Sequence, residues 1–176
     1  TLGSLVALNT SGENFVAWCW NAGNSGASNT AGATNTTSTF SSATAGVSVS
    51  TYTGTGSETT FGHGLGVTPA TVLILQRSND DNHNISNWET GVTAFSEKMN
   101  LDLDGAADGS STQLPAATST TWTAGSDSGL NGSSRTYVAW NWAAGNSGSS
   151  NTDGSINTTT TYVDTTAGIS IGTYTG

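Results

Sequence analysis

"YVAWNWAAGNSGSSNTDG", residues 137–154, is the stretch from which the fold is predicted, because the chain contains it twice. Its near copy is "FVAWCWNAGNSGASNTAG", residues 15–32. Shifting the sequence by 122 residues aligns 1–54 with 123–176 without a gap, and 31 of these 54 positions are identical. A period of this length is too long for one turn of a solenoid and predicts a tandem array of domains.

Two polar segments, 24–39 and 146–161, suggest the boundaries of the repeats, because they carry turn-forming residues and almost no apolar side chains. We interpret them as connectors. Residues 1–22 are then the C-terminal strands of a preceding repeat, 23–44 a polar connector, 45–144 one complete repeat, 145–167 a second connector and 168–176 the first strand of a following repeat. Both chain ends are expected to lie within an array, and the strand at 168–176 should stand apart or pair with a neighbouring chain.

The composition favours short strands and many turns. Of the 176 residues, 34% are hydrophobic and 9% charged, and Gly, Ser, Thr and Asn make up most of the rest. Gly, Ser, Thr and Asn are poor helix formers, because Gly loses much backbone entropy and the other three compete for backbone hydrogen bonds. Six Trp, four Tyr and four Phe, mostly within β-branched runs, argue against a disordered chain.

The charge excludes two classes of partner. Three Lys and Arg residues face twelve Asp and Glu residues, giving a formal net charge of -9. Three cationic side chains can neutralise only a few phosphate groups. We therefore expect no nucleic-acid binding and no adhesion to anionic membranes. No apolar run has the length of a membrane-spanning helix. The single cysteine, Cys19, aligns with Asn141 in the second copy, which gives no indication of a nucleophile or a metal ligand.

Strand patterns recur at the spacing of all-β folds and predict an antiparallel β-sandwich of jelly-roll-like form. The predicted strands are 46–54, 70–77, 84–90, 98–104, 120–126 and 135–142. Within 135–142, alternation places Val138, Trp140 and Trp142 on one face. The Trp pair has two interpretations, a stacking platform for sugars or core packing, and we predict that the Val-Trp-Trp face packs in the core.

Three longer stretches together resemble a repeated β domain of tailed-phage structural proteins. They are "TYTGTGSETTFGHGLGVTPATVLILQRS" (51–78), "MNLDLDGAADGSSTQ" (99–113) and "GLNGSSRTYVAWNWAAG" (129–145). The residues that match the family pattern are Tyr52 or Tyr174, His63, Gly64, Gly66, Pro69, Arg77, Trp88, Leu101, Leu103, Tyr137 and Trp140. The resemblance covers the whole 122-residue period, and such domains are common in tail-fibre-like and other virion surface proteins of marine phages.

The resemblance implies a non-catalytic virion structural repeat, of a tail fibre or another surface appendage, that gives reach and multivalent contact. It implies a virion or extracellular location, association with other copies of the virion protein as a homo-oligomer, and a host surface glycan as a further partner. It assigns no catalytic residue. The alternative hypothesis is a carbohydrate-binding adhesin or lectin-like module, in which Trp88 or Trp122 on a loop stacks on a glycan beside Asp or Asn residues.

The remaining motifs favour structural roles. "FGHGLG" (61–66) predicts a tight turn, with Gly64 and Gly66 at positive φ and Pro69 fixing the start of the next strand. A phosphate site would need a following helix, and a strand follows. No pair of carboxylates and no Ser-His-Asp set stands out, so we expect no enzyme activity.

Two cation motifs remain, of which "NDDNHN" (79–84) is the lesser candidate. Asp102, Asp104 and Asp108 in "DLDGAAD" lie close together in sequence and resemble part of a calcium loop, although the closing Glu of the full loop is missing. The same carboxylates fit the solvent face of an edge strand. Calcium is therefore the only metal ion that the sequence suggests, and we predict no other cofactor.

Overall fold

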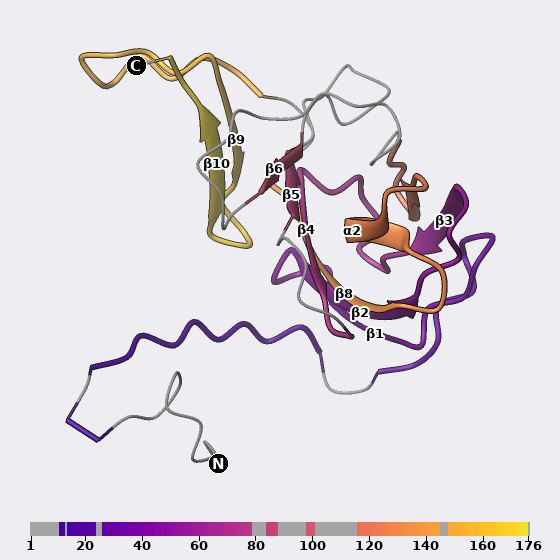
Figure 1. The fold of residues 1–176 in the computed structure, drawn as a ribbon. Helices are drawn as coiled ribbons and strands as arrows, with labels where there is room; N and C mark the ends of the chain where they lie inside the picture. The colour runs from indigo at the N-terminus through magenta and orange to yellow at the C-terminus, as the bar shows by residue number, and fades with distance from the viewer. Residues whose placement is uncertain are drawn as a thin grey trace.

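The described residues fold into antiparallel β-structure with one short helix among them (Figure 1). The computed structural model describes residues 11–12, 14–23, 26–78, 84–87, 98–100, 116–144 and 148–175, with the backbone alone for 84–87 and 98–100. The helix is α2 (Ser128–Asn131), and the strands are β1 (Ser38–Ser42), β2 (Val47–Thr53), β3 (Thr59–Gly62), β4 (Thr71–Gln76), β5 (Asn84–Asn87), β6 (Lys98–Asn100), β7 (Thr121–Ala124), β8 (Thr136–Trp142), β9 (Thr160–Asp164) and β10 (Ile169–Thr173). The prediction of an all-β, antiparallel class is confirmed for these residues.

The largest sheet has six strands in the order β1-β2-β8-β4-β5-β6. Strand β8, which carries the repeated tryptophans, lies inside it and pairs with β2 on one edge and with β4 on the other. The register along β2 runs from Val47 opposite Trp142 to Thr53 opposite Thr136. Because both edges of β8 are hydrogen-bonded, the repeated motif forms the middle of the sheet.

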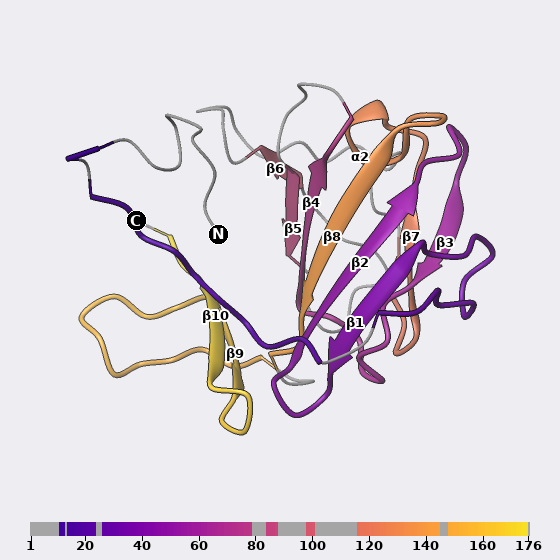
Figure 2. The same cartoon turned by 90° about the horizontal axis from the view of Figure 1, so that it is seen from below.

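A second layer, formed by the β3–β7 pair and α2, covers one face of this sheet (Figure 2). The core between the layers is built from four aromatic rings, those of Tyr52, Phe61, Trp122 and Tyr137. The Tyr52 ring lies 4.2 Å from the Phe61 ring and stacks on Tyr137 at 5.1 Å, measured between centroids. Aromatic residues bury more area than any other type, so this cluster is the main apolar stabilisation of the fold.

The face of β8 that enters this core is the opposite of the predicted one. Tyr137, Ala139 and Asn141 are buried, whereas Val138, Trp140 and Trp142 lie partly exposed on the outer face. The prediction that the Val-Trp-Trp face packs inward is therefore wrong. The reason is volume: Phe61 and Trp122 come from the facing layer, and the small Ala139 on β8 fits against them.

The predicted connector at 23–44 also differs from the structure, because it contains an edge strand and packs on the domain. Ser38–Ser42 is β1, which pairs with β2, and Ala27 forms a bridge with Thr39. Hydroxyl groups join this polar segment to the sheet: Thr36 Oγ1 lies 2.8 Å from Thr39 Oγ1, which lies 3.1 Å from Ser50 Oγ. A segment with almost no apolar side chains is thus held largely by hydrogen bonds, which hydropathy does not reveal.

The C-terminal hairpin β9–β10 lies 122 residues after β1–β2 and has the same register. Ser38 opposite Thr51 corresponds to Thr160 opposite Thr173. Among the described strands the hairpin forms a sheet of its own, and strand β9 lies within the predicted connector 145–167. Tyr162 anchors it on Ala70 and Ala144.

Candidate interface on the outer sheet face

An apolar row crosses the outer face of the six-stranded sheet. Phe40 lies opposite Val49, Val49 opposite Trp140, and Trp140 opposite Leu73, so one row spans four strands. All four side chains are only partly buried, with Phe40 37% exposed. A row of this kind on the face away from the core indicates a contact surface, because isolated exposed apolar residues are common but contiguous ones are not.

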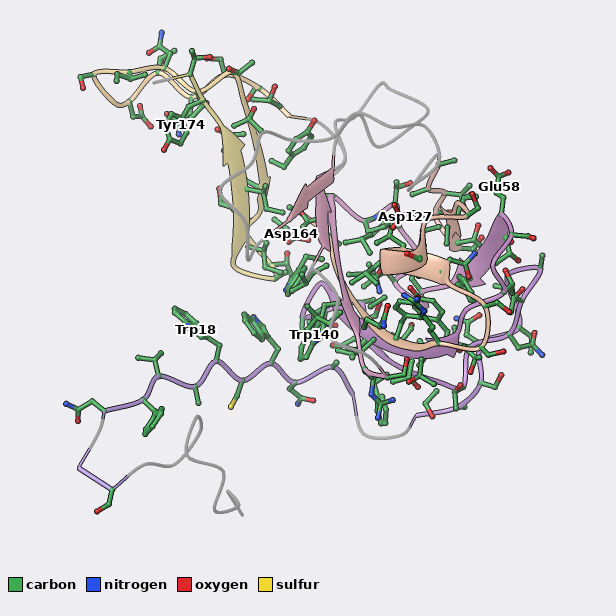
Figure 3. The ribbon with its side chains drawn as sticks, in the orientation of Figure 1. Trp18, Glu58, Asp127, Trp140, Asp164 and Tyr174 are labelled. Atoms are coloured by element: carbon green, nitrogen blue, oxygen red, sulfur yellow. The ribbon has the colours of Figure 1, made fainter. Side chains whose placement is uncertain are left out.

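Four tryptophans from the two copies of the motif meet on this face (Figure 3). Trp140 and Trp142 stack with 6.2 Å between ring centroids. Trp20, from the N-terminal segment, meets both of them edge-on at 5.9 Å. Trp18 stacks on Trp20 at 6.3 Å and remains 77% exposed. We call these four residues the Trp cluster.

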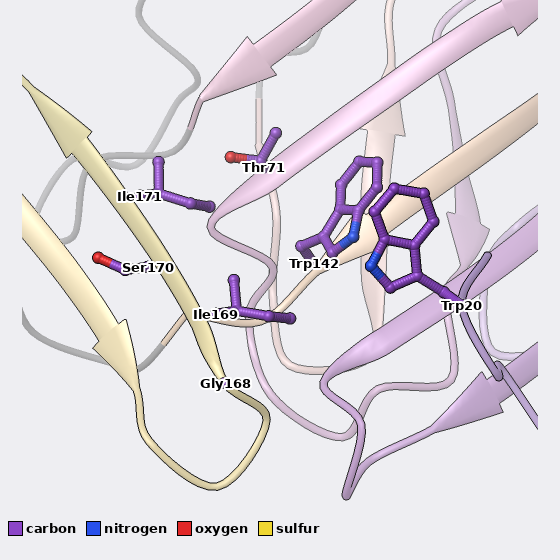
Figure 4. Close-up of a pocket in the computed structure, with 7 residues that line it drawn as sticks. All are labelled: Trp20, Thr71, Trp142, Gly168, Ile169, Ser170 and Ile171. Atoms are coloured by element: carbon purple, nitrogen blue, oxygen red, sulfur yellow. The ribbon is translucent and has the colours of Figure 1, made fainter. Parts of the chain in front are cut away.

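A cavity of about 390 Å³ lies between the Trp cluster and the C-terminal hairpin (Figure 4). Trp20 and Trp142 form one wall, and Ile169 and Ile171 of β10 form the other. Thr71, Gly168 and Ser170 complete its lining. The lining has two hydroxyl groups and no charged side chain, so the cavity suits aliphatic or aromatic groups better than a polar ligand.

The N-terminal segment 14–20 is the most exposed apolar part of the described chain. Phe15 is 50% exposed, Val16 82% and Trp20 45%. The segment corresponds to β8, whose equivalent Tyr137 is fully buried. The repeated sequence predicted a strand here, but in the structure 14–20 forms no strand and pairs with none of the described strands.

His63 and its glycine-rich turn have the structural role that the sequence predicted. Gly64 and Gly66 have φ of 73° and 78°. The His63 ring is buried, with Nδ1 accepting a hydrogen bond from Leu65 N and Nε2 lying 3.2 Å from Thr118 O. These partners suit the neutral ring with the proton on Nε2. Burial lowers the pKa of His63, opposed by the hydrogen bond to Thr118.

Trp122 does not lie on a loop as the glycan hypothesis required. It is in β7, fully buried between Tyr52 and Phe61. This position corrects its assignment as a sugar platform, since no ligand reaches its ring. The other glycan candidate, Trp88, lies outside the described residues, as do the calcium candidates Asp102, Asp104 and Asp108.

Within the described part of the chain, the acidic groups do not gather into a site. Glu58 lies directly before β3, Asp127 directly before α2 and Asp164 at the end of β9 (Figure 3). Asp127 caps α2 by accepting a hydrogen bond from Gly129 N. No group of three potential metal ligands occurs among these residues, and Cys19 is free and exposed. None of the described helices has the length and apolar character needed to span a membrane.

Comparison with known proteins gives one family and no individual relative. A family model described as "Domain of unknown function (DUF7483)" matches residues 2–129 and, separately, residues 112–176. No curated protein and no solved structure matches the chain.

Proposed function

The chain belongs to the DUF7483 family, and from the two matches of this family we propose that it carries tandem copies of a non-catalytic β-sandwich with a period of 122 residues. The jelly-roll-like unit is the two-layered domain around Tyr52, Phe61, Trp122 and Tyr137. In this proposal the array is a structural part of a virion appendage such as a phage tail fibre, where rigid units in series give reach and repeated weak contacts add up.

The observation that carries the proposal is a set of hydrogen bonds that occurs twice, 122 residues apart. Thr36 N donates to Asn29 O, and Thr158 N donates to Asn151 O. Asn29 N donates to Thr36 Oγ1 over 2.8 Å, and Asn151 N donates to Thr158 Oγ1 over 2.7 Å. Two segments that share both sequence and hydrogen bonding support one structural unit used repeatedly.

The array is tested with chains that carry one, two, four or eight periods in series. Small-angle scattering and negative-stain electron microscopy should show a maximum dimension that grows linearly with the number of periods, in equally spaced globules. Chains that collapse into a single globule, or whose added periods stay unfolded, contradict the array.

The virion role needs a separate test, because many proteins contain tandem β domains. Antibodies raised against the folded chain should label appendages on virus particles purified from the source of the sequence, as seen by immunogold electron microscopy. Peptides of the chain should also co-purify with intact particles in mass spectrometry. Detection only in the particle-free cell fraction contradicts a virion location and leaves the array untouched.

A further inference from the structure

The C-terminal hairpin β9–β10 makes an apolar contact with the domain that precedes it. The Tyr162 ring packs on Ala70 and Ala144, and only 3% of the residue is exposed. Ile169 and Ile171 of β10 pack against the same cluster. We call the two alanines the alanine seat. In the proposed array the hairpin opens one copy and the alanine seat belongs to the copy before it, so the contact joins two consecutive copies.

The turns of the two hairpins make a second contact across the same boundary. Gly46 lies in the turn between β1 and β2 with a φ of 61°, and a Cβ placed on it would lie 2.7 Å from the Cβ of Ala167. Ala167 lies in the corresponding turn between β9 and β10, beside Gly168, the equivalent of Gly46. Figure 2 shows the hairpin β9–β10 beside this end of the large sheet. The spacing leaves room only for a hydrogen at position 46, so the two turns are in direct contact.

The position of Tyr162 carries an aromatic ring in both copies of the sequence. Its equivalent is Phe40. Each ring lies against a glycine, Phe40 against Gly26 and Tyr162 against Gly148, and the two glycines are also equivalent. A Cβ on either glycine would collide with ring atoms. The period therefore keeps both the ring and the glycine beneath it, as expected for a contact that every copy makes.

The polar connector leaves little free chain between the two copies. Ser149 forms a bridge with β9, with backbone hydrogen bonds in both directions. Gly148 lies against the Tyr162 ring, and Ala144 packs on the same ring. Only residues 145–147 separate these two positions in the sequence. Because a chain of this length spans at most about 14 Å between the flanking Cα atoms, it restricts the motion of one copy relative to the next.

The face of the hairpin that makes the contact corresponds to the outer face of the six-stranded sheet. Tyr162 lies opposite Ile171. Their equivalents are Phe40 and Val49, which lie opposite each other in the apolar row of the outer face. None of the side chains in the contact cluster is charged, so the acidic character of the chain does not oppose it. The outer face of one copy thus matches the alanine seat of the copy before it.

We propose that this contact is the joint of the array. The aromatic ring at the position of Tyr162 in each copy sits on the alanine seat of the copy before it, and the hairpin turns pack against each other at Gly46. The partner is the adjoining copy in the same chain. The inference rests on the proposed array and adds that consecutive copies hold a fixed orientation, whereas domains joined by an open linker move relative to each other.

The alanine seat is tested first in the chain of 176 residues. Tetranitromethane nitrates accessible tyrosines, and mass spectrometry of the peptides gives the rate at each one. Tyr162 should react about tenfold more slowly than Tyr174, which is 72% exposed. Ala70→Glu places a charge in the alanine seat and should bring the two rates within about twofold, whereas Val67→Glu, at a more exposed position before the same strand, should not. Equal rates in the unaltered chain would overturn the proposal.

The joint itself is tested in a chain lengthened by one period, in which residues 55–176 follow Gly176 and continue the repeat in frame. Cys19→Ser removes the native thiol, and Glu58→Cys in both copies places one exposed nitroxide label on each. Double electron–electron resonance should give one narrow distribution of distances between the labels. Tyr162→Ala should widen this distribution about twofold or more, because it removes the ring from the alanine seat. Ala70→Glu alters the other side of the contact and should widen it as well.

Phe40→Ala is the matched control. It removes a ring at the equivalent position of the first copy, away from the boundary between the two complete copies, and should leave the distribution narrow. A broad distribution in the unaltered chain, with both copies folded by near-ultraviolet circular dichroism, overturns the joint and leaves the array standing. A narrow distribution that persists in Tyr162→Ala and Ala70→Glu also overturns the joint alone. An added period that does not fold overturns the array, and the joint with it.

Discussion

Two buried tyrosines connect the six-stranded sheet to the turn that precedes β8. Tyr52 Oη donates to Leu130 O over 2.6 Å. Tyr137 Oη donates to Ser128 O over 2.6 Å and accepts from Gly132 N over 2.8 Å. Burial raises the pKa of Tyr52 well above its usual value, and the neighbouring Tyr137 adds to the rise, so the Tyr52 phenol stays protonated as a donor.

Tyr137→Phe tests this connection by removing only the phenol oxygen. The variant keeps the ring in the core but leaves Gly132 N without its acceptor, which should cost about 1–3 kcal/mol in the free energy of unfolding. Urea denaturation followed by tryptophan fluorescence gives this value. Tyr174→Phe, at an exposed ring, is the control and should change stability by less than about 0.5 kcal/mol. A similar loss in both variants would contradict the role of the buried phenol.

His63 makes stability depend on pH in a predictable direction. Burial holds its pKa in the folded state below the value of about 6.5 expected in the unfolded chain. Between these two values the unfolded chain binds the proton and the folded one does not, so stability is complete above about pH 6.5 and falls on acidification. The loss ends below the folded pKa.

The measurement is the free energy of unfolding from about pH 7.5 to about pH 5.5, where the slope due to one histidine stays below about 1.4 kcal/mol per pH unit. His63→Gln should remove part of this slope. His83→Gln changes the second histidine and should leave it in place. If the slope persists in His63→Gln and disappears in His83→Gln, the assignment is wrong.

At the scale of elements, the polar segment before β1 is the feature whose packing is least visible in the sequence. Thr34 N donates to Thr60 O over 3.0 Å, and Ala33 N donates to Thr60 Oγ1 over 2.8 Å. Gly32 lies directly against this part of β3: a Cβ on Gly32 would clash with the Thr60 carbonyl oxygen. The segment therefore fastens the edge strand β1 to the covering layer.

Gly32→Ala and Gly154→Ala form a matched pair, since the two glycines occupy the same position in the two copies. The clash at Thr60 should make Gly32→Ala cost about 1–3 kcal/mol, because the backbone of β3 or of the segment must shift. At Gly154 the nearest atom lies 3.4 Å from the added Cβ, so Gly154→Ala should be nearly neutral. Thermal unfolding of both variants checks this difference, and equal melting temperatures would contradict the packed segment.

The same elements show what the sequence could predict. Strands β2, β4, β7 and β8 lie where alternation and β-branched residues placed them, because these patterns reflect local backbone preference. Strand β1 was missed because its residues are almost all Ser and Thr. The inward face of β8 was misassigned because both faces carry large rings, and the choice depends on Phe61 and Trp122 from a distant part of the chain.

The candidate interface was also only partly predictable from the sequence. The repeat marked Trp140 and Trp142 as a pair and showed their correspondence to Trp18 and Trp20. That the four rings meet on the outer face depends on the path of the chain between the copies, for which the sequence holds no local signal. Trp122 lies in the predicted strand 120–126, as the strand pattern indicated; only the alternative glycan hypothesis placed it on a loop, and its aromatic neighbours hold it in the core.

At the scale of the whole molecule, two hairpins of related sequence and the same register lie in different surroundings. The β1–β2 hairpin is completed by β8, whereas the β9–β10 hairpin rests on the domain through Tyr162 and the two isoleucines of β10. An isolated two-stranded hairpin is marginally stable in water. Comparing the stability of the two hairpins therefore measures how much the third strand, β8, stabilises β1–β2.

Hydrogen–deuterium exchange measures that contribution directly. In dilute protein the amides of β10 should exchange on the order of a hundredfold faster than those of β2, because β10 opens locally while β2 opens only with the sheet. Tyr162→Ala should speed exchange in β9 and β10 and leave β1 and β2 unchanged, since Tyr162 packs with Ala70 and Ala144 in a cluster separate from the main core. Equal protection of β2 and β10 would show that the hairpin needs no third strand.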